Sequence, residues 1–84
     1  MKTITIDCAG ILSKAALHQT LAQALDFPDW YGHNMDALMD CLTDLEDIQL
    51  TCNNWDQLGA WAADFADTFA DAARENPFFQ FTLS

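Results

Sequence analysis

Positive charge is what this chain has least of. Three Lys or Arg residues stand against 13 Asp or Glu, which gives a formal net charge of −10 over 84 residues. This imbalance argues against nucleic acid and anionic membrane surfaces as partners, because both are negatively charged. It suits a cationic partner, although an excess of acid also keeps a small protein soluble.

Cysteine is scarce as well, and no two cysteines lie close together in the sequence. Cys8, Cys41 and Cys52 are an odd number with wide spacing, so neither a disulfide framework nor a zinc motif is expected. We predict that all three fill small apolar positions in the core of a cytoplasmic protein. The first residues run straight into a strand pattern, so we expect no signal peptide.

Motifs of enzymes and of membrane segments are missing too. There is no Gly-rich phosphate loop and no Gly-x-Ser-x-Gly nucleophile motif. No apolar run approaches the length that spans a membrane. The chain is nevertheless 51% hydrophobic, with six Phe and three Trp, which is typical of a globular protein. We therefore predict a single folded domain over residues 1–84, without catalytic activity and without a cofactor.

The spacing of apolar residues divides the chain into strands and helices. Ser13 is the expected N-cap of the first helix, and Asn53 or Asn54 that of the last helical region. Long helical crossovers between strands imply parallel pairing. We predict an α/β fold, a three-stranded parallel β-sheet flanked by three to four α-helices. In order, the expected elements are a strand (2–7), a helix (14–25), a helix from residue 35, a strand (48–52), one or two helices (54–76) and a strand covered on both faces (78–83).

The segment Phe27–Leu45 is the most informative part of the chain. Pro28 disfavours helix at the residue before it and Gly32 can act as a hinge, so a loop is expected there. His33 or Asn34 can then cap a short helix. The buried face of that helix follows the i, i+3, i+4, i+7 spacing and consists of Met35, Leu38, Met39 and Leu42.

The other face of this helix is acidic. Asp36 and Asp40 are like charges at i, i+4, as are Asp40 and Asp44, and each such pair costs an isolated helix a few tenths of a kcal/mol. No cation within the helix neutralises them. His33 and Thr43 lie on the same face, within about 100° of arc. Local stability therefore does not explain this acidic face.

Two chemistries fit an acidic face that follows two aromatic residues, Trp30 and Tyr31. A carboxylate can occupy the place of a substrate phosphate in the basic cleft of a phosphate-handling enzyme, where it forms charge-assisted hydrogen bonds with Arg. The alternative is a metal site made by His33, Asp36 and Asp40, although hard cations usually need more converging oxygens. The first histidine of the chain, His18, is expected at the edge of the first helix's buried stripe.

Three segments around this region form a specific pattern. They are Leu17–Leu21 followed by Pro28, the run Trp30–Leu38, and Asp40–Thr43. The pattern closely resembles the barstar family of intracellular ribonuclease inhibitors over residues 17–43. The resemblance is weaker at the C-terminal end, and between residues 55 and 69 this chain is shorter than the family.

The resemblance implies the same three-stranded parallel sheet and a loop–helix segment that plugs the active site of a microbial ribonuclease. Asp40 would be the central acid that meets the enzyme's phosphate-binding Arg and His residues. Asp36 would pair with cations beside it, Trp30 would pack on the catalytic histidine, and Asp71 would add a peripheral ion pair. The implied partner-binding residues are Trp30, Tyr31, Gly32, Asn34, Met35, Asp36, Met39, Asp40, Thr43, Asp44 and Asp71.

The rim of this expected interface departs from the family pattern. His33 replaces an acid, Met39 and Leu45 replace tryptophans, and Asp44 replaces a glycine. We therefore expect a basic ribonuclease other than barnase, bound 1:1 by a chain that is monomeric when free. Barstar-like folds also resemble immunity proteins that neutralise ribonuclease toxins delivered between competing bacteria. A barstar-like module for a partner that is not a ribonuclease is the remaining alternative.

Overall fold

A computed structural model describes all 84 residues. It contains three strands, three α-helices and two short 3₁₀ turns, which confirms the predicted α/β class. None of the helices is both long and apolar enough to span a membrane. The elements are β1 (Lys2–Asp7), α1 (Lys14–Ala24), α2 (Met35–Thr43), β2 (Ile48–Asn53), the 3₁₀ turns Trp55–Gln57 and Ala60–Ala62, α3 (Ala63–Glu75) and β3 (Phe79–Leu83).

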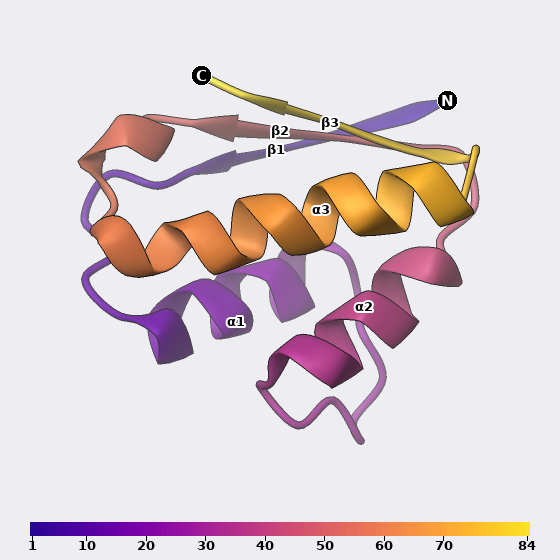
Figure 1. The fold of residues 1–84 in the computed structure, drawn as a ribbon, viewed down its shortest axis with the longest axis horizontal. Helices are drawn as coiled ribbons and strands as arrows, with labels where there is room; N and C mark the ends of the chain where they lie inside the picture. Colours follow the sequence, from indigo (N-terminus) through magenta and orange to yellow (C-terminus); the bar gives the residue numbers. More distant parts are fainter.

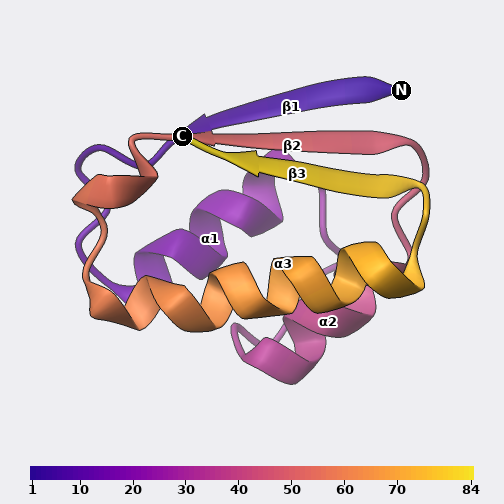
Figure 2. The ribbon, with the colours of Figure 1, turned by 45° about the horizontal axis from the view of Figure 1, so that its top comes forward.

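The sheet has the order β1–β2–β3, and both neighbouring pairs are parallel, as predicted. All three helices lie on one face of the sheet, and the other face is open (Figures 1 and 2). The expectation that β3 is covered on both faces is therefore wrong. Gln80 and Thr82 point to the open face and are exposed, because successive side chains of a strand point to opposite faces.

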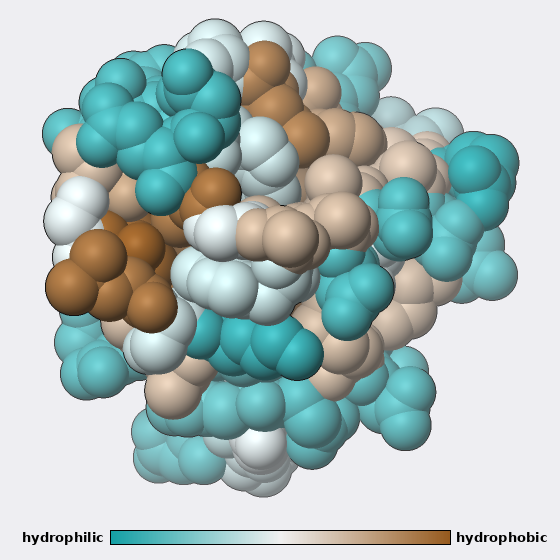
Figure 3. All heavy atoms as spheres, turned by 60° about the vertical axis from the view of Figure 1, so that its left-hand side comes forward, coloured by the Kyte–Doolittle hydropathy of each residue, from teal (hydrophilic) through white to brown (hydrophobic).

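The covered face of the sheet is built from apolar side chains in register. Ile4 pairs with Leu50, and Leu50 pairs with Phe81. Helix α3 brings Phe69 against this face, where its ring packs on Phe79 and Phe81. Phe65 of the same helix belongs to the same core, and both residues are fully buried. Apolar burial of this kind is the main source of stability in a small domain. The face of the molecule shown in Figure 3 is mixed, with hydrophilic side chains around its edge and apolar side chains between them.

Side chains start the first two helices as the sequence predicts. The Ser13 hydroxyl accepts a hydrogen bond from the Ala16 N–H, and the Asn34 side chain accepts one from the Ala37 N–H. At the end of α1, Asp26 takes a left-handed conformation with φ of 56°, and the Phe27 N–H donates to the Ala22 carbonyl. This closure of the helix end turns the chain sharply into the Phe27–Asn34 loop.

The region between β2 and β3 contains one α-helix, which answers the question that the sequence left open. The apolar face that begins at Trp55 passes through two 3₁₀ turns before α3 starts. Neither predicted cap forms, because Asn54 is left-handed and makes no side-chain cap, and Asn53 is the last residue of β2. Gly59 lies between the two turns. A side chain at this position would collide with Trp61, because a Cβ there would lie 2.7 Å from Trp61 Nε1.

Asn76 joins the end of α3 to the end of α2. This side chain is buried, and its amide nitrogen donates to the carbonyls of Leu42 and Leu45 at 3.0 and 2.8 Å. Its oxygen accepts from the Phe78 N–H at 3.0 Å. The last carbonyls of a helix lack their regular helical donors. Asn76 supplies a donor to the part-buried Leu45 carbonyl and a further donor to the Leu42 carbonyl, which also accepts from the Leu45 N–H. The carboxyl end of α2 is thereby fixed against the core.

We expect Asn76→Ala to lower the free energy of unfolding by about 2 kcal/mol, because it removes three hydrogen bonds of a buried side chain and leaves the part-buried Leu45 carbonyl without this donor. Urea denaturation followed by circular dichroism measures this change. Asn53→Ala, at an exposed position, is the matched control and should change stability by no more than about 0.5 kcal/mol. Equal effects of the two substitutions would show that Asn76 does not fix the helix end.

Candidate partner-binding site

The loop before α2 places Trp30 and Tyr31 on opposite sides of the chain. Trp30 is 63% exposed, whereas Tyr31 is only 8% exposed and belongs to the hydrophobic core. The Tyr31 ring also packs on Phe27 at a centroid distance of 4.9 Å. Trp30 is therefore presented to the outside by a loop that Tyr31 anchors inside. The predicted partner contact of Tyr31 is confined to the small part of the residue that stays accessible.

A buried histidine holds Tyr31 in place. The Tyr31 hydroxyl lies 2.5 Å from Nδ1 of His18, which is 4% exposed and packs on Phe65 at a centroid distance of 4.7 Å. The expectation that His18 lies at the edge of the α1 stripe is therefore wrong. Burial raises the pKa of Tyr31 well above its ordinary value, so the phenol keeps its proton. Burial, with smaller contributions from His33 and Lys14, lowers the pKa of His18.

The residues between Tyr31 and α2 set the angle at which the helix leaves the loop. His33 has a left-handed backbone with φ of 52°, and its ring stacks on His18 at 6.0 Å with an interplanar angle of 6°. A Cβ on Gly32 would lie 2.9 Å from the Asn34 amide nitrogen. Because Gly32 has no Cβ, the Asn34 side chain that caps α2 can lie close to it.

Helix α2 has one buried face and one charged face, as predicted. Leu38, Cys41 and Leu42 are buried, and Met35 and Met39 are half-buried beside them. Asp36, Asp40 and Asp44 are all exposed, and Thr43 is half-buried, its hydroxyl donating to the Asp40 carbonyl at 3.0 Å. None of these three carboxylates forms a salt bridge, because the one ion pair of the chain joins Asp71 to Arg74.

Asp71 differs from the acids of α2 in this respect. It lies on α3, and its carboxylate accepts a hydrogen bond from the Arg74 guanidinium one turn away. Both side chains are largely exposed, so the pair adds little to stability. A partner that binds Asp71 has to compete with Arg74, which fits the minor role that the resemblance implies for this residue.

The structure does not support the alternative of a metal site. No group of three or more His, Cys, Asp or Glu side chains is arranged to hold a metal ion. The His33 ring stacks on the His18 ring and does not form a metal-binding group with Asp36 and Asp40. The neighbouring thiol of Cys41 is no activated nucleophile either. Burial raises its pKa, and Asp44 and Asp40 raise it further.

A shallow pocket lies beside Trp30, between the ends of α1 and α2. Its volume is about 180 Å³. Apolar walls from Phe27, Trp30 and Leu45 meet the carboxylates of Asp26 and Asp44 there. The negative ends of both helix dipoles point to this region. Such a pocket suits a cationic side chain with an apolar stem, and the sequence prediction did not include Asp26 among the site residues.

The sequence analysis did not identify most of the residues that position the site. His18 and Asn76 hold the loop and the end of α2, yet each acts on residues far away in the chain. The only available signal was their polar character next to apolar neighbours, which is shared by many surface residues.

Comparisons with known proteins agree with this geometry. The model of one family, described as Barstar (barnase inhibitor), matches residues 1–83. A curated protein of Bacillus subtilis (strain 168), "Putative ribonuclease inhibitor YrdF", is 38% identical over 77 residues. The alignment covers 89% of this chain and 85% of that protein.

The buried histidine makes stability depend on pH. The pKa of native His18 is lower than the ordinary value of 6.5, so the unfolded chain takes up a proton that the native state refuses. The free energy of unfolding should therefore fall as the pH drops from about 7 toward the lowered native pKa. Urea denaturation at pH values above the range in which carboxylates titrate measures this slope.

We expect His18→Gln to flatten the pH dependence and the exposed control His33→Gln to retain most of it. The groups that face His18 are Tyr31, His33, Lys14 and Phe65. His33 is the only other imidazole among them, which makes it the appropriate control. If the pH dependence survives in His18→Gln and disappears in His33→Gln, it arises from His33, and the attribution to His18 is contradicted.

Proposed function

The chain belongs to the barstar family, and from that premise we propose that it inhibits a microbial ribonuclease by occluding the active site. The segment from Trp30 to Asp44 is the part that enters the enzyme. The protein has no catalytic activity of its own. Its partner is a basic ribonuclease, bound in a 1:1 complex by a chain that is monomeric when free.

The observation on which this proposal chiefly rests is the unpaired acid on α2. Asp36 and Asp40 are exposed, lie one turn apart and have no cation beside them. A fixed carboxylate can take the place of a substrate phosphate and accept charge-assisted hydrogen bonds from Arg. Because the helix is held at both ends, these carboxylates are already oriented before a partner arrives, which reduces the entropy lost on binding.

The roles of single residues follow from matching family positions. Asp40 is the central acid that meets the phosphate-binding Arg and His residues of the enzyme. Asp36 pairs with cations next to them, and the exposed Trp30 packs on the catalytic histidine. A basic side chain of the enzyme fills the pocket between Trp30 and Asp44.

The partner is a ribonuclease other than barnase, because the rim of the site differs from the family at His33, Met39, Asp44 and Leu45. An immunity protein against a ribonuclease toxin delivered by competing bacteria uses the same acidic plug. We place the protein in the cytoplasm, which is supported by three free cysteines, all buried. A reducing compartment keeps such thiols free.

The partner can be identified with the tagged protein as bait. Lysates and secreted fractions of its own bacterium and of competing bacteria are the samples, and Asp40→Ala is the control bait. We expect a small basic protein to bind the wild-type bait only and to cleave RNA until excess bait is added. A stable partner without nuclease activity would contradict the proposed function and leave the family assignment intact.

Substitutions in the site should weaken binding in a defined order. We expect Asp40→Ala to raise the Kd by roughly thirtyfold or more, because it leaves buried cations of the partner without a counter-charge. Asp36→Ala and Trp30→Ala should have smaller effects, and Asp71→Ala the smallest, since Asp71 is already paired with Arg74. Isothermal titration calorimetry against the captured ribonuclease measures the order.

The matched control for these variants is Asp56→Ala, which removes one exposed carboxylate from the 3₁₀ turn that follows β2. It changes the net charge by the same amount without touching α2. A near-neutral Asp40→Ala, or an equal loss in Asp56→Ala, would refute the mechanism.

Association with the ribonuclease should be strongly slowed by salt. The net charge of −10 attracts a basic partner over long distances, and mobile ions screen this attraction beyond about 8 Å at physiological ionic strength. Stopped-flow mixing at increasing salt should show a falling association rate constant and a much smaller change in the dissociation rate constant. An association rate constant that does not vary with salt would exclude electrostatic steering.

A further inference from the structure

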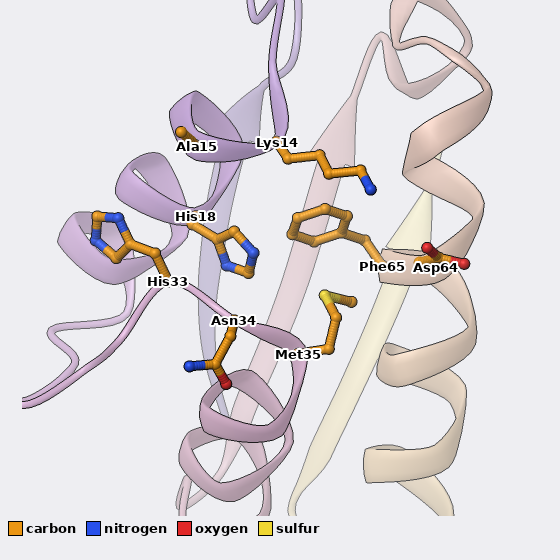
Figure 4. Close-up of a pocket in the computed structure, with 8 residues that line it drawn as sticks. All are labelled: Lys14, Ala15, His18, His33, Asn34, Met35, Asp64 and Phe65. Carbon is orange, nitrogen blue, oxygen red and sulfur yellow. The ribbon is translucent and has the colours of Figure 1, made fainter.

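A second, larger pocket lies on the other side of the Phe27–Asn34 loop. Its volume is about 370 Å³, and it opens between the amino ends of all three helices (Figure 4). Lys14 and Ala15 begin α1, Asn34 caps α2, and Asp64 lies in the first turn of α3. The full lining consists of Lys14, Ala15, His18, His33, Asn34, Met35, Asp64 and Phe65.

This pocket collects most of the basic side chains of an otherwise acidic protein. The chain has three Lys or Arg and two His residues, five in all, and Lys14, His18 and His33 line this one pocket. Lys14 forms no salt bridge. It also lies at the amino end of α1, where the helix dipole disfavours positive charge. The position of Lys14 is therefore not explained by the stability of its own helix.

The buried His18 directs an unused polar group into the pocket. Tyr31 keeps its proton and can donate it to Nδ1 of His18, and this arrangement places the histidine proton on Nε2. The opposite arrangement, with Nδ1–H donating to Tyr31, would leave both the tyrosine proton and the Nε2 lone pair without partners. Nε2 has no hydrogen-bond partner within the protein, and because no buried side-chain nitrogen or oxygen lacks a partner, the 4% of His18 that remains exposed includes this atom, which is open to the pocket. An acceptor atom in the pocket would satisfy this N–H.

We propose that this pocket binds the carboxylate of an acidic side chain of the partner protein. The Nε2–H of His18 and the Lys14 ammonium are two donors for its oxygens, and the amino ends of the helices favour its charge. Ala15, Met35 and Phe65 provide apolar walls for the methylene stem of a glutamate. Asp64, the one acid of the lining, lies on the far side of the Phe65 ring from His18, and the flexible Lys14 side chain ends on the same side of the ring as Asp64 (Figure 4).

The position of the pocket indicates that the partner supplies this carboxylate. Asn34 and Met35 line the pocket and also belong to the predicted partner-binding residues. A protein that covers α2 and its loop therefore lies over the mouth of the pocket. This inference rests on the proposed function and adds that the ribonuclease carries an acidic residue beside its basic cleft.

The pocket can be tested without the partner by NMR of protein labelled with ¹⁵N-histidine. The probe is N-acetyl-glutamate amide, and the matched neutral control is N-acetyl-glutamine amide. We expect the glutamate probe alone to shift the His18 Nε2–H signal saturably. The shift should persist in Lys2→Met and disappear in Lys14→Met, both of them substitutions at exposed positions. No shift, an equal shift with the neutral probe, or a stronger effect of inorganic phosphate would overturn the assignment to a carboxylate.

A second measurement separates this inference from the proposed function. Against the captured ribonuclease, we expect Lys14→Met to raise the Kd about tenfold, the effect of one charge-assisted hydrogen bond. Lys2→Met should leave the Kd unchanged. If Asp40→Ala abolishes binding and Lys14→Met has no effect, the pocket proposal fails and the proposed function stands. If the wild-type protein binds no ribonuclease, the proposed function fails, and the NMR titration still reports whether the pocket takes a carboxylate.

Discussion

The hydrogen bond between His18 and Tyr31 is the contact on which the geometry of the site depends. It ties the Phe27–Asn34 loop to α1 across 13 positions of the sequence, inside the core. With Tyr31 held inside, Trp30 has to point outward, and the chain reaches Asn34 in the orientation that caps α2. A buried polar contact of this kind is stable when its groups are satisfied. No buried side-chain nitrogen or oxygen of the protein lacks a hydrogen-bond partner, and His18 also lines the neighbouring pocket.

The second constraint is electrostatic. Asp36, Asp40 and Asp44 repel one another along α2 and form no salt bridge within the protein that would offset the repulsion. The helix is kept by its packed face, by the Asn34 cap and by Asn76 at its far end. The fold thus holds a charged surface that would be more stable with a partner bound. Residues that oppose stability locally while being rigidly supported are typical of binding sites.

The sequence predicted those features that depend on neighbours close in the chain. The parallel sheet, the Ser13 and Asn34 caps and the two faces of α2 follow from spacing and capping chemistry alone. The errors concern contacts between distant segments. His18 is buried because Phe65 and Tyr31 cover it, and β3 has an open face because no helix crosses behind the sheet. Asn54 does not cap a helix because a left-handed turn replaces the expected start, and the positioning role of Asn76 depends on residues more than 30 positions away.

The central claim is that α2 occupies the active site of a ribonuclease, and inhibition kinetics test it most directly. The initial rate of RNA cleavage is measured at several concentrations of substrate and inhibitor, with and without a nucleoside 3′-monophosphate that fills the active site. Competitive inhibition that the nucleotide weakens in proportion to its own occupancy is the predicted result. Inhibition that is independent of both substrate and nucleotide would place the contact elsewhere on the enzyme and contradict the account.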